Sequence, residues 1–199
     1  LATSADTGQG QIVSLGPVTL RATTGDIALQ GALAGLVSGN STTGIGALVL
    51  TADAGQVRLA GVRSNAAVSA TARTGVSLTA NSIVATGAVT LNGGTGGVTL
   101  AQSGSSAGNA AVESGGDVDL EGSGAMQLNG SLRSGAQIKV GATSTNASLA
   151  MASGTVLDAA GRVVLNSGGA VTLRGVKSGA DVSVTGNAIT LVGNTGYVD

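Results

Sequence analysis

Few residues of this 199-residue chain could do chemistry, and the clearest set is basic. Arg63, Arg133 and Lys177 each follow an aliphatic residue in the related phrases "GVRSNA", "GSLRSGA" and "RGVKSGA". On the surface of a repeating structure they would form a stripe that makes weak contacts with an anion, such as a sulfated glycan. Intervening repeats lack the basic residue, so the broken stripe also fits charges that keep the surface soluble and block aggregation.

Two carboxylates and two sequons are further candidates. Asp117 and Asp119 form "DVD", and residues two apart on a strand face the same side, about 6–7 Å apart. They could contact calcium, but solvated surface is the better interpretation. Asn40 in "NST" and Asn146 in "NAS" match the glycosylation sequon, a match that arises easily by chance in a Ser/Thr-rich chain.

The composition excludes most catalytic chemistry. The chain has no His and no Cys, so it cannot build an ordinary zinc site or a Ser-His or Cys-His nucleophile. "GGTGG" at 93–97 lacks the Lys of a phosphate-binding loop. A net charge of −1 gives no general attraction to nucleic acid or anionic lipid. We expect no catalytic residue, no metal and no cofactor, and therefore no enzyme.

The elements that would position these residues are short repeated strands. Segments such as "PVTLR", "QVRLA" and "AVTLR" recur in pairs along the chain, with aliphatic and polar residues in alternation. Their spacing gives about eight turns of roughly 20 residues, as a parallel β-helix requires. Hairpins remain an alternative, because Asn-Gly pairs stand at 92–93 and 129–130, but hairpins do not produce this order of long and short intervals.

The predicted inward residues form columns that are aliphatic throughout, with methionine at two places. The first column of the leading strand runs from Val18 through Leu48 and Val118 to Val182, while the residues between the columns are mostly polar. A weaker third column of Leu33, Val62, Leu132 and Val176 suggests a third side. Segments 34–46 and 103–116 are interpreted as loops. Asp119 and Lys139 fall in one outward column, so we expect them to be neighbours.

The phrases "GQVRLAGVRSNAAVSATA" at 55–72 and "GAVTLRGVKSGADVSVTG" at 169–186 resemble the repeat region of filamentous haemagglutinins, the exoproteins of bacterial two-partner secretion. The resemblance covers nearly the whole chain. It implies a right-handed β-helical shaft, export through an outer-membrane barrel partner, and adhesion or contact-dependent competition at the bacterial surface. The family's secretion domain and any toxin or receptor-binding tip are not visible in the sequence.

The resulting prediction is an all-β, right-handed parallel β-helix in which residues 1–199 form a single segment of a longer filament. The start "LATSADTGQG" lacks Met and the features of a signal peptide, which favours an excerpt or a processed product. The expected function is a secreted structural shaft, continuous with or stacked on further β-helical segments, with an unknown surface or glycan ligand. One alternative is a carbohydrate-binding or carbohydrate-active β-helix such as a phage tailspike, which needs clustered acids or aromatics. Another is an ice-binding solenoid, which needs regular outward Thr.

Overall fold

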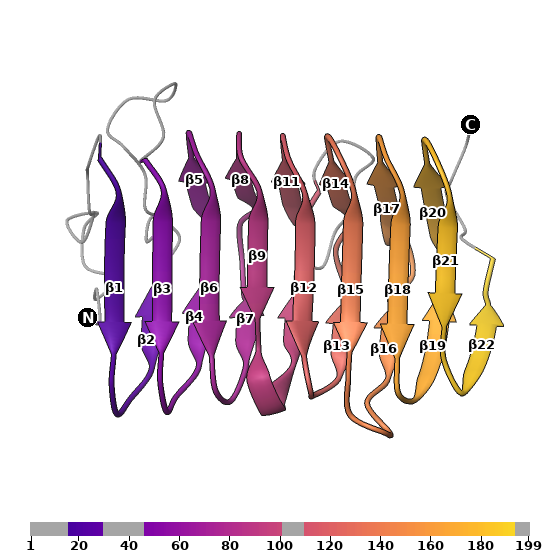
Figure 1. Cartoon of the computed structure of the whole chain (residues 1–199), viewed down its shortest axis with the longest axis horizontal. Coiled ribbons are helices and arrows are strands. Elements are labelled where there is room, and N and C mark those ends of the chain that lie inside the picture. The colour runs from indigo at the N-terminus through magenta and orange to yellow at the C-terminus, as the bar shows by residue number, and fades with distance from the viewer. Residues whose placement is uncertain (1–15, 30–45, 101–109, 194–199) are drawn as a thin grey trace.

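The structure, a computed structural model, describes residues 16–29, 46–100 and 110–193. Within these ranges the chain forms strands and one three-residue 3-10 turn, η1 (Gly94–Gly96), and it winds into a coil with three sheets. We call one turn of the coil a rung. Strands of one sheet run downward on the near side of Figure 1, and those of the other two run upward behind while the chain advances from left to right. The solenoid is therefore right-handed, as predicted.

Each sheet collects one strand from successive rungs, and the described part covers eight rungs, six of them with all three strands. Sheet A contains β1 (Val18–Ala22), β3 (Leu48–Ala52), β6 (Val68–Ala72), β9 (Val89–Asn92), β12 (Val118–Gly122), β15 (Ile138–Ala142), β18 (Val163–Ser167) and β21 (Val182–Thr185). Sheet B contains β2 (Ile27–Leu29), β4 (Val57–Leu59), β7 (Val76–Leu78), β10 (Val98–Leu100), β13 (Met126–Leu128), β16 (Leu149–Met151), β19 (Ala170–Leu173) and β22 (Ala188–Leu191). Sheet C contains β5 (Val62–Ser64), β8 (Ile83–Ala85), β11 (Val112–Ser114), β14 (Leu132–Ser134), β17 (Val156–Ala159) and β20 (Gly175–Ser178).

The pairing between strands is parallel throughout the described residues. β1 pairs with β3, one rung away, in the register Val18↔Leu48 and Leu20↔Leu50, rather than with β2, the next strand in the chain. The same register continues to the last rung, where Val163 stands beside Val182. Hairpins between consecutive strands are thus excluded in this part of the chain, and the parallel β-helix prediction is confirmed.

The core lies inside the coil and consists of the aliphatic columns that the sequence predicted. In sheet A, Leu48, Val118 and Val163 have no exposed surface, and the same holds for Val57 and Leu149 in sheet B. Because each inward side chain packs on its equivalents one rung above and below, about 4.8 Å away, every interior rung is covered on both sides. The last rung lacks this cover: the inward residues Val182 and Ile189 are each 49% exposed, and Leu191 is 78% exposed.

Sheet C corrects the interpretation of residues 103–116 as a loop, because β11 (Val112–Ser114) lies within that segment. Ile83, Val112 and Leu157 are buried and complete the third inward column, in which the sequence had suggested only Val62, Leu132 and Val176 among the described residues. Leu33 and most of the predicted loop 34–46 lie outside the described residues. The strands of sheet C were hard to recognise because their second inward position is mostly serine, which breaks the apolar alternation.

Those serines tie successive rungs together at the corner between sheets C and A. The side chains of Ser64, Ser114, Ser134 and Ser178 each donate a hydrogen bond to a glycine carbonyl of the preceding rung, over 2.7–2.8 Å. Each hydroxyl also accepts a hydrogen bond from the backbone N–H two residues later. A small polar side chain therefore satisfies backbone groups where the sheet ladder is interrupted.

Candidate functional site

Sheet C brings the three predicted basic residues into one outward column. From rung to rung, the order of residues in this column is Arg63, Val84, Glu113, Arg133, Asp158 and Lys177. The predicted alignment of Arg63, Arg133 and Lys177 is therefore correct. The rungs between them carry no further cation: one carries Val84 and two carry a carboxylate.

We call Glu113, Arg133, Asp158 and Lys177 the charge ladder, because they occupy four successive rungs with alternating sign. Arg133 Nη1 lies 3.2 Å from Glu113 Oε1, and Lys177 Nζ lies 3.7 Å from Asp158 Oδ1. Half of the Arg133 side chain and 63% of the Lys177 side chain remain exposed. Each exposed pair contributes at most about 1 kcal/mol to stability, so the ladder leaves both cations accessible to other groups.

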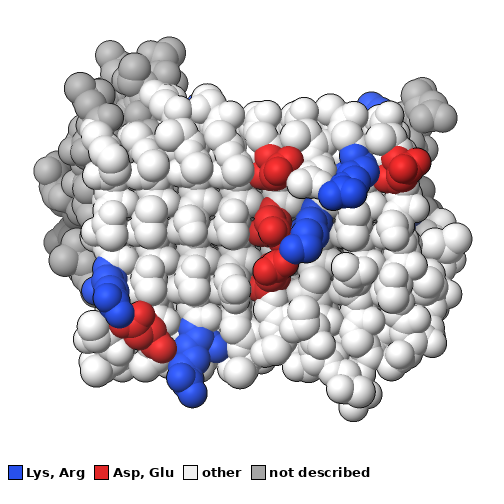
Figure 2. All heavy atoms as spheres, viewed as in Figure 1, with Lys and Arg blue, Asp and Glu red and all other residues white. Residues whose placement is uncertain are grey.

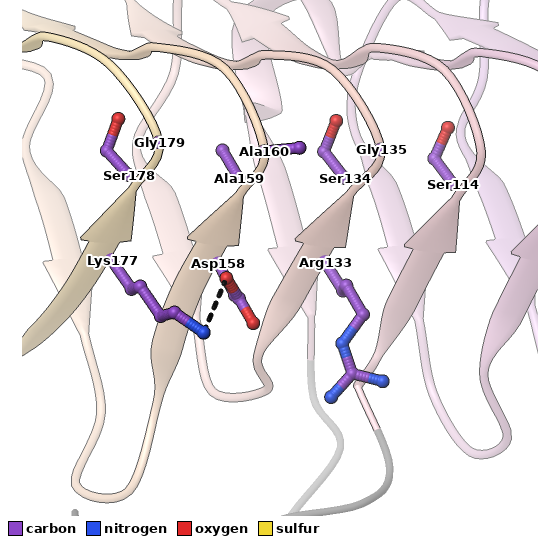
Figure 3. Close-up of a pocket in the computed structure, with 10 residues that line it drawn as sticks. All are labelled: Ser114, Arg133, Ser134, Gly135, Asp158, Ala159, Ala160, Lys177, Ser178 and Gly179. Carbon is purple, nitrogen blue, oxygen red and sulfur yellow. Dashed lines mark ion pairs between the residues drawn. The ribbon is translucent and has the colours of Figure 1, made fainter. Parts of the chain in front are cut away.

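A hollow of about 500 Å³ lies beside the charge ladder, at the corner between sheets C and A. Its lining includes Arg133, Asp158 and Lys177 together with small residues such as Gly135 and Ala160. Figure 3 shows the three charged side chains on one side of the strands, with Ser114, Ser134 and Ser178 pointing the other way. The hollow therefore has one charged wall and an uncharged floor built from small side chains and backbone.

The floor must be small because adjacent rungs touch there. A methyl group added at Gly135 would lie 2.4 Å from the carbonyl oxygen of Gly115, and one at Gly179 would lie 2.0 Å from that of Ala160. Both distances are far below van der Waals contact. The same close approach that requires glycine for stacking thus leaves the outer surface of the corner hollow.

A second group of charges lies on sheet A. Asp119 stands beside Lys139 in the outward column, with Oδ2 3.6 Å from Nζ, as the sequence predicted. Lys139 also forms an ion pair with Glu121, and Asp117 accepts hydrogen bonds from the backbone and side-chain amides of Gln137. Figure 2 shows acidic side chains one below another near the middle of the near face, with basic side chains beside them.

Burial and the neighbouring carboxylate of Glu121 raise the pKa of Asp119 above its usual 3.8. One of its oxygens, Oδ1, is buried and has no hydrogen-bond partner. The hydrogen bond to Glu121 and the charge of Asp119 raise the pKa of Lys139 above 10.5. In the described residues no group of three or more His, Cys, Asp or Glu side chains is arranged to hold a metal ion, and Lys139 acts as the counter-ion of this cluster.

The remaining candidates from the sequence are the two glycosylation sequons. Asn146 is exposed in the connection between β15 and β16, whereas Asn40 lies outside the described residues. Sequence reasoning missed Glu113 and Asp158 as members of the basic column, although Glu113 precedes Arg133 by 20 residues, about one turn. The interpretation of 103–116 as a loop hid the first, and the unrecognised strand β17 hid the second.

Comparison of the chain with protein-family models, curated proteins and solved structures finds no match. The described part of the chain contains no helix that is long and apolar enough to cross a membrane.

Proposed function

We propose that this chain is a structural shaft of a secreted bacterial surface filament or adhesin. In this role it catalyses nothing, is exported through an outer-membrane barrel partner, and holds a distal binding or effector region away from the cell. The observation that carries the proposal is the unbroken register of the core through eight rungs, with charged outward residues mainly paired to one another. A parallel coil of this kind lengthens by about 4.8 Å per rung without changing its cross-section.

The last described rung presents apolar side chains that a neighbouring β-helical segment would cover. Val182, Ile189 and Leu191 occupy inward columns but are exposed, whereas their equivalents one rung earlier, Val163, Val171 and Leu173, are buried. Among the described residues β20, β21 and β22 each pair with a strand on one side only, and a β-helical segment with aliphatic residues in the same columns would pair with them and cover this surface. The neighbours expected for this surface are therefore β-helical segments of the same design.

The location is tested on intact cells that make the protein. Antibodies raised against residues 110–193 should label unpermeabilised cells, and external protease should remove the signal while a cytoplasmic marker stays intact. Deleting the gene of the barrel partner should abolish surface labelling and leave the chain inside the cell. Labelling that requires permeabilisation would overturn the proposal.

Carbohydrate binding is a second candidate, and the hollow favours it. Arg133 and Lys177 lie two rungs apart, about 10 Å along the axis, on one wall of the same hollow. This arrangement suits an extended polyanion that presents an anionic group to each cation, although Asp158 stands between them. Binding of heparin and polygalacturonate by titration calorimetry tests it: wild type should bind and the double variant Arg133→Gln, Lys177→Gln should not, while no binding by wild type would remove this candidate.

A further inference from the structure

The order of charges along the charge ladder is complementary to its own reverse, a property that the ion pairs within one chain do not require. From rung to rung the order is Glu113, Arg133, Asp158, Lys177, or minus, plus, minus, plus. Reversing that order gives plus, minus, plus, minus. A reversed copy placed against the original would therefore present the opposite charge at all four positions.

The axial spacing of the ladder restricts the partner. Successive members are one rung apart, about 4.8 Å. Side chains on one face of an extended peptide repeat at about 6.6 Å, and successive turns of an α-helix at 5.4 Å, so either would drift out of step across four rungs. Another β-solenoid has the same repeat and stays in step over the whole ladder.

The ladder is also accessible. The side chains of Arg133 and Lys177 are 50% and 63% exposed, and those of Glu113 and Asp158 are 34% and 35% exposed. The Arg133 guanidinium has five N–H donors, and only its Nη1 atom contacts Glu113. The Nζ atom of Lys177 lies 3.7 Å from Oδ1 of Asp158. Each group can contact an opposite charge on a second molecule while it keeps its neighbour in the same chain.

We propose that two copies of this chain pack side by side and antiparallel through the outward face of sheet C. A two-fold axis would pass between Arg133 and Asp158, so that Arg133 meets Asp158 of the other copy and Lys177 meets its Glu113. The contact is isologous and closes on itself as a pair. It does not depend on a surface location or on any ligand of the proposed shaft.

The contact should be weak and sensitive to salt. The four rungs of the ladder span only about 19 Å along the axis. The contact therefore buries less surface than a standard interface, which covers about 800 Å² on each partner. Exposed charges are screened beyond about 8 Å at physiological ionic strength. Association should therefore be measurable at high protein concentration in about 20 mM salt and weaken by about tenfold or more in 300 mM salt.

The experiment compares the wild type with a sign-reversed chain that carries Glu113→Lys, Arg133→Glu, Asp158→Lys and Lys177→Glu. Reversal preserves the alternation within each chain and the net charge, so stacking of the ladder stays favourable. Antiparallel pairing predicts that wild type associates with itself and reversed chain with itself, whereas the mixed pair places like charges opposite each other. Energy transfer between chains labelled at a single added C-terminal cysteine, a residue type that the sequence lacks, measures all three combinations in low salt without modifying Lys177, and circular dichroism checks the fold.

Homotypic association at least tenfold tighter than mixed association would support the proposal. Three results would overturn it: no salt-sensitive association of the wild type, equal association of all three pairs, which would place the contact elsewhere, or tighter mixed association, which would indicate parallel packing. If the reversed chain fails to fold, the double variant Arg133→Gln, Lys177→Gln should lose association at an unchanged melting temperature. The matched control Arg58→Gln, Arg73→Gln changes the net charge equally on other faces and should retain it.

Discussion

Two kinds of residue decide whether rungs can stack closely: glycines where backbones touch, and charged residues where side chains of one column meet. At the corner glycines the restriction is steric, because the neighbouring rung supplies a carbonyl oxygen within contact distance. In the outward columns it is electrostatic, because parallel in-register stacking brings equivalent side chains together. Asp119 beside Lys139 and Arg133 beside Glu113 show how alternating charge avoids repulsion between like neighbours.

The steric restriction predicts unequal effects for two glycine-to-alanine changes. Gly135→Ala should lower the free energy of unfolding by about 1–3 kcal/mol, because its methyl group would overlap the carbonyl of Gly115 at 2.4 Å. Gly141→Ala is the control: its methyl group would meet only Glu121 Cγ, at 4.0 Å, and should leave stability unchanged or raise it slightly. Chemical denaturation followed by circular dichroism measures both, and equal effects would contradict the steric explanation.

The half-buried carboxylate of Asp119 predicts a dependence of stability on pH. Because the pKa of Asp119 is raised on folding, the folded protein binds this proton more tightly than the unfolded chain. This residue's contribution therefore improves as the pH falls through the raised pKa, is complete below about 3.8, and is lost as the pH rises. Asp119→Asn should be at least as stable as wild type at pH 7, since Lys139 keeps Glu121 as a partner, and its advantage should shrink on acidification.

Denaturation curves of the two proteins between pH 3 and 8 measure the difference. Ser69→Ala, in the same outward column, is the control and should show no pH-dependent difference from wild type. An Asp119→Asn variant that is clearly less stable at pH 7 would mean that the ion pair with Lys139 outweighs the cost of burial.

The three sheets are stabilised in different ways. Sheets A and B have two aliphatic columns each, so their strands are held by packing as well as by backbone hydrogen bonds. Sheet C has one aliphatic column and one that is mostly serine, whose hydroxyls bind the backbone of the neighbouring rung. Hydrogen bonding thus replaces part of the apolar packing on that side, next to the hollow.

This arrangement predicts a modest, local cost for removing one corner serine. Ser134→Ala would leave the carbonyl of Gly116 and the N–H of Ala136 without the hydroxyl partner and should lower the free energy of unfolding by about 1 kcal/mol. The cost should be no greater because alanine already occupies the equivalent places at 85 and 159. Ser77→Ala, on the outward face of sheet B, is the control and should change stability little.

At the scale of the whole molecule, the two ends of the described solenoid differ. The inward residues Val18, Ile27 and Leu29 of the first described rung are between 3% and 7% exposed, and Leu20 is partly buried. Those of the last rung are exposed by about half or more at Val182, Ile189 and Leu191, so the free apolar surface is concentrated at one end. Within the described residues this surface lies beside β20, β21 and β22, which each pair on one side only, and such a surface is a site of association.

Self-association through the last rung should persist in high salt, unlike contact through the charge ladder, because it rests on apolar burial and strand pairing. Ile189→Lys with Leu191→Lys should reduce it strongly in analytical ultracentrifugation. Thr190→Lys is the matched control, because it adds a charge to the same strand on the outward face and should leave the association largely intact. Equal loss in both variants would indicate that charge alone prevents contact.

From the sequence one can predict the coil, its parallel pairing, the aliphatic columns and the Asp119–Lys139 neighbours. All of these follow from alternation of period two within each strand and from the recurrence of paired strands at intervals that are mostly close to 20 residues. The alignment of Arg63, Arg133 and Lys177 is also predictable, because the same phrase surrounds each of them.

Only the tertiary structure decided what surrounds those basic residues. The strands that carry Glu113 and Asp158 pair an aliphatic residue with a small one at their inward positions, so they lack the pattern by which a strand is recognised. Their register depends on connections of different length, which place Arg133 20 residues after Glu113 and 25 residues before Asp158. The ion pairs, the charge ladder and the hollow therefore come from stacking between rungs, and no single repeat contains them.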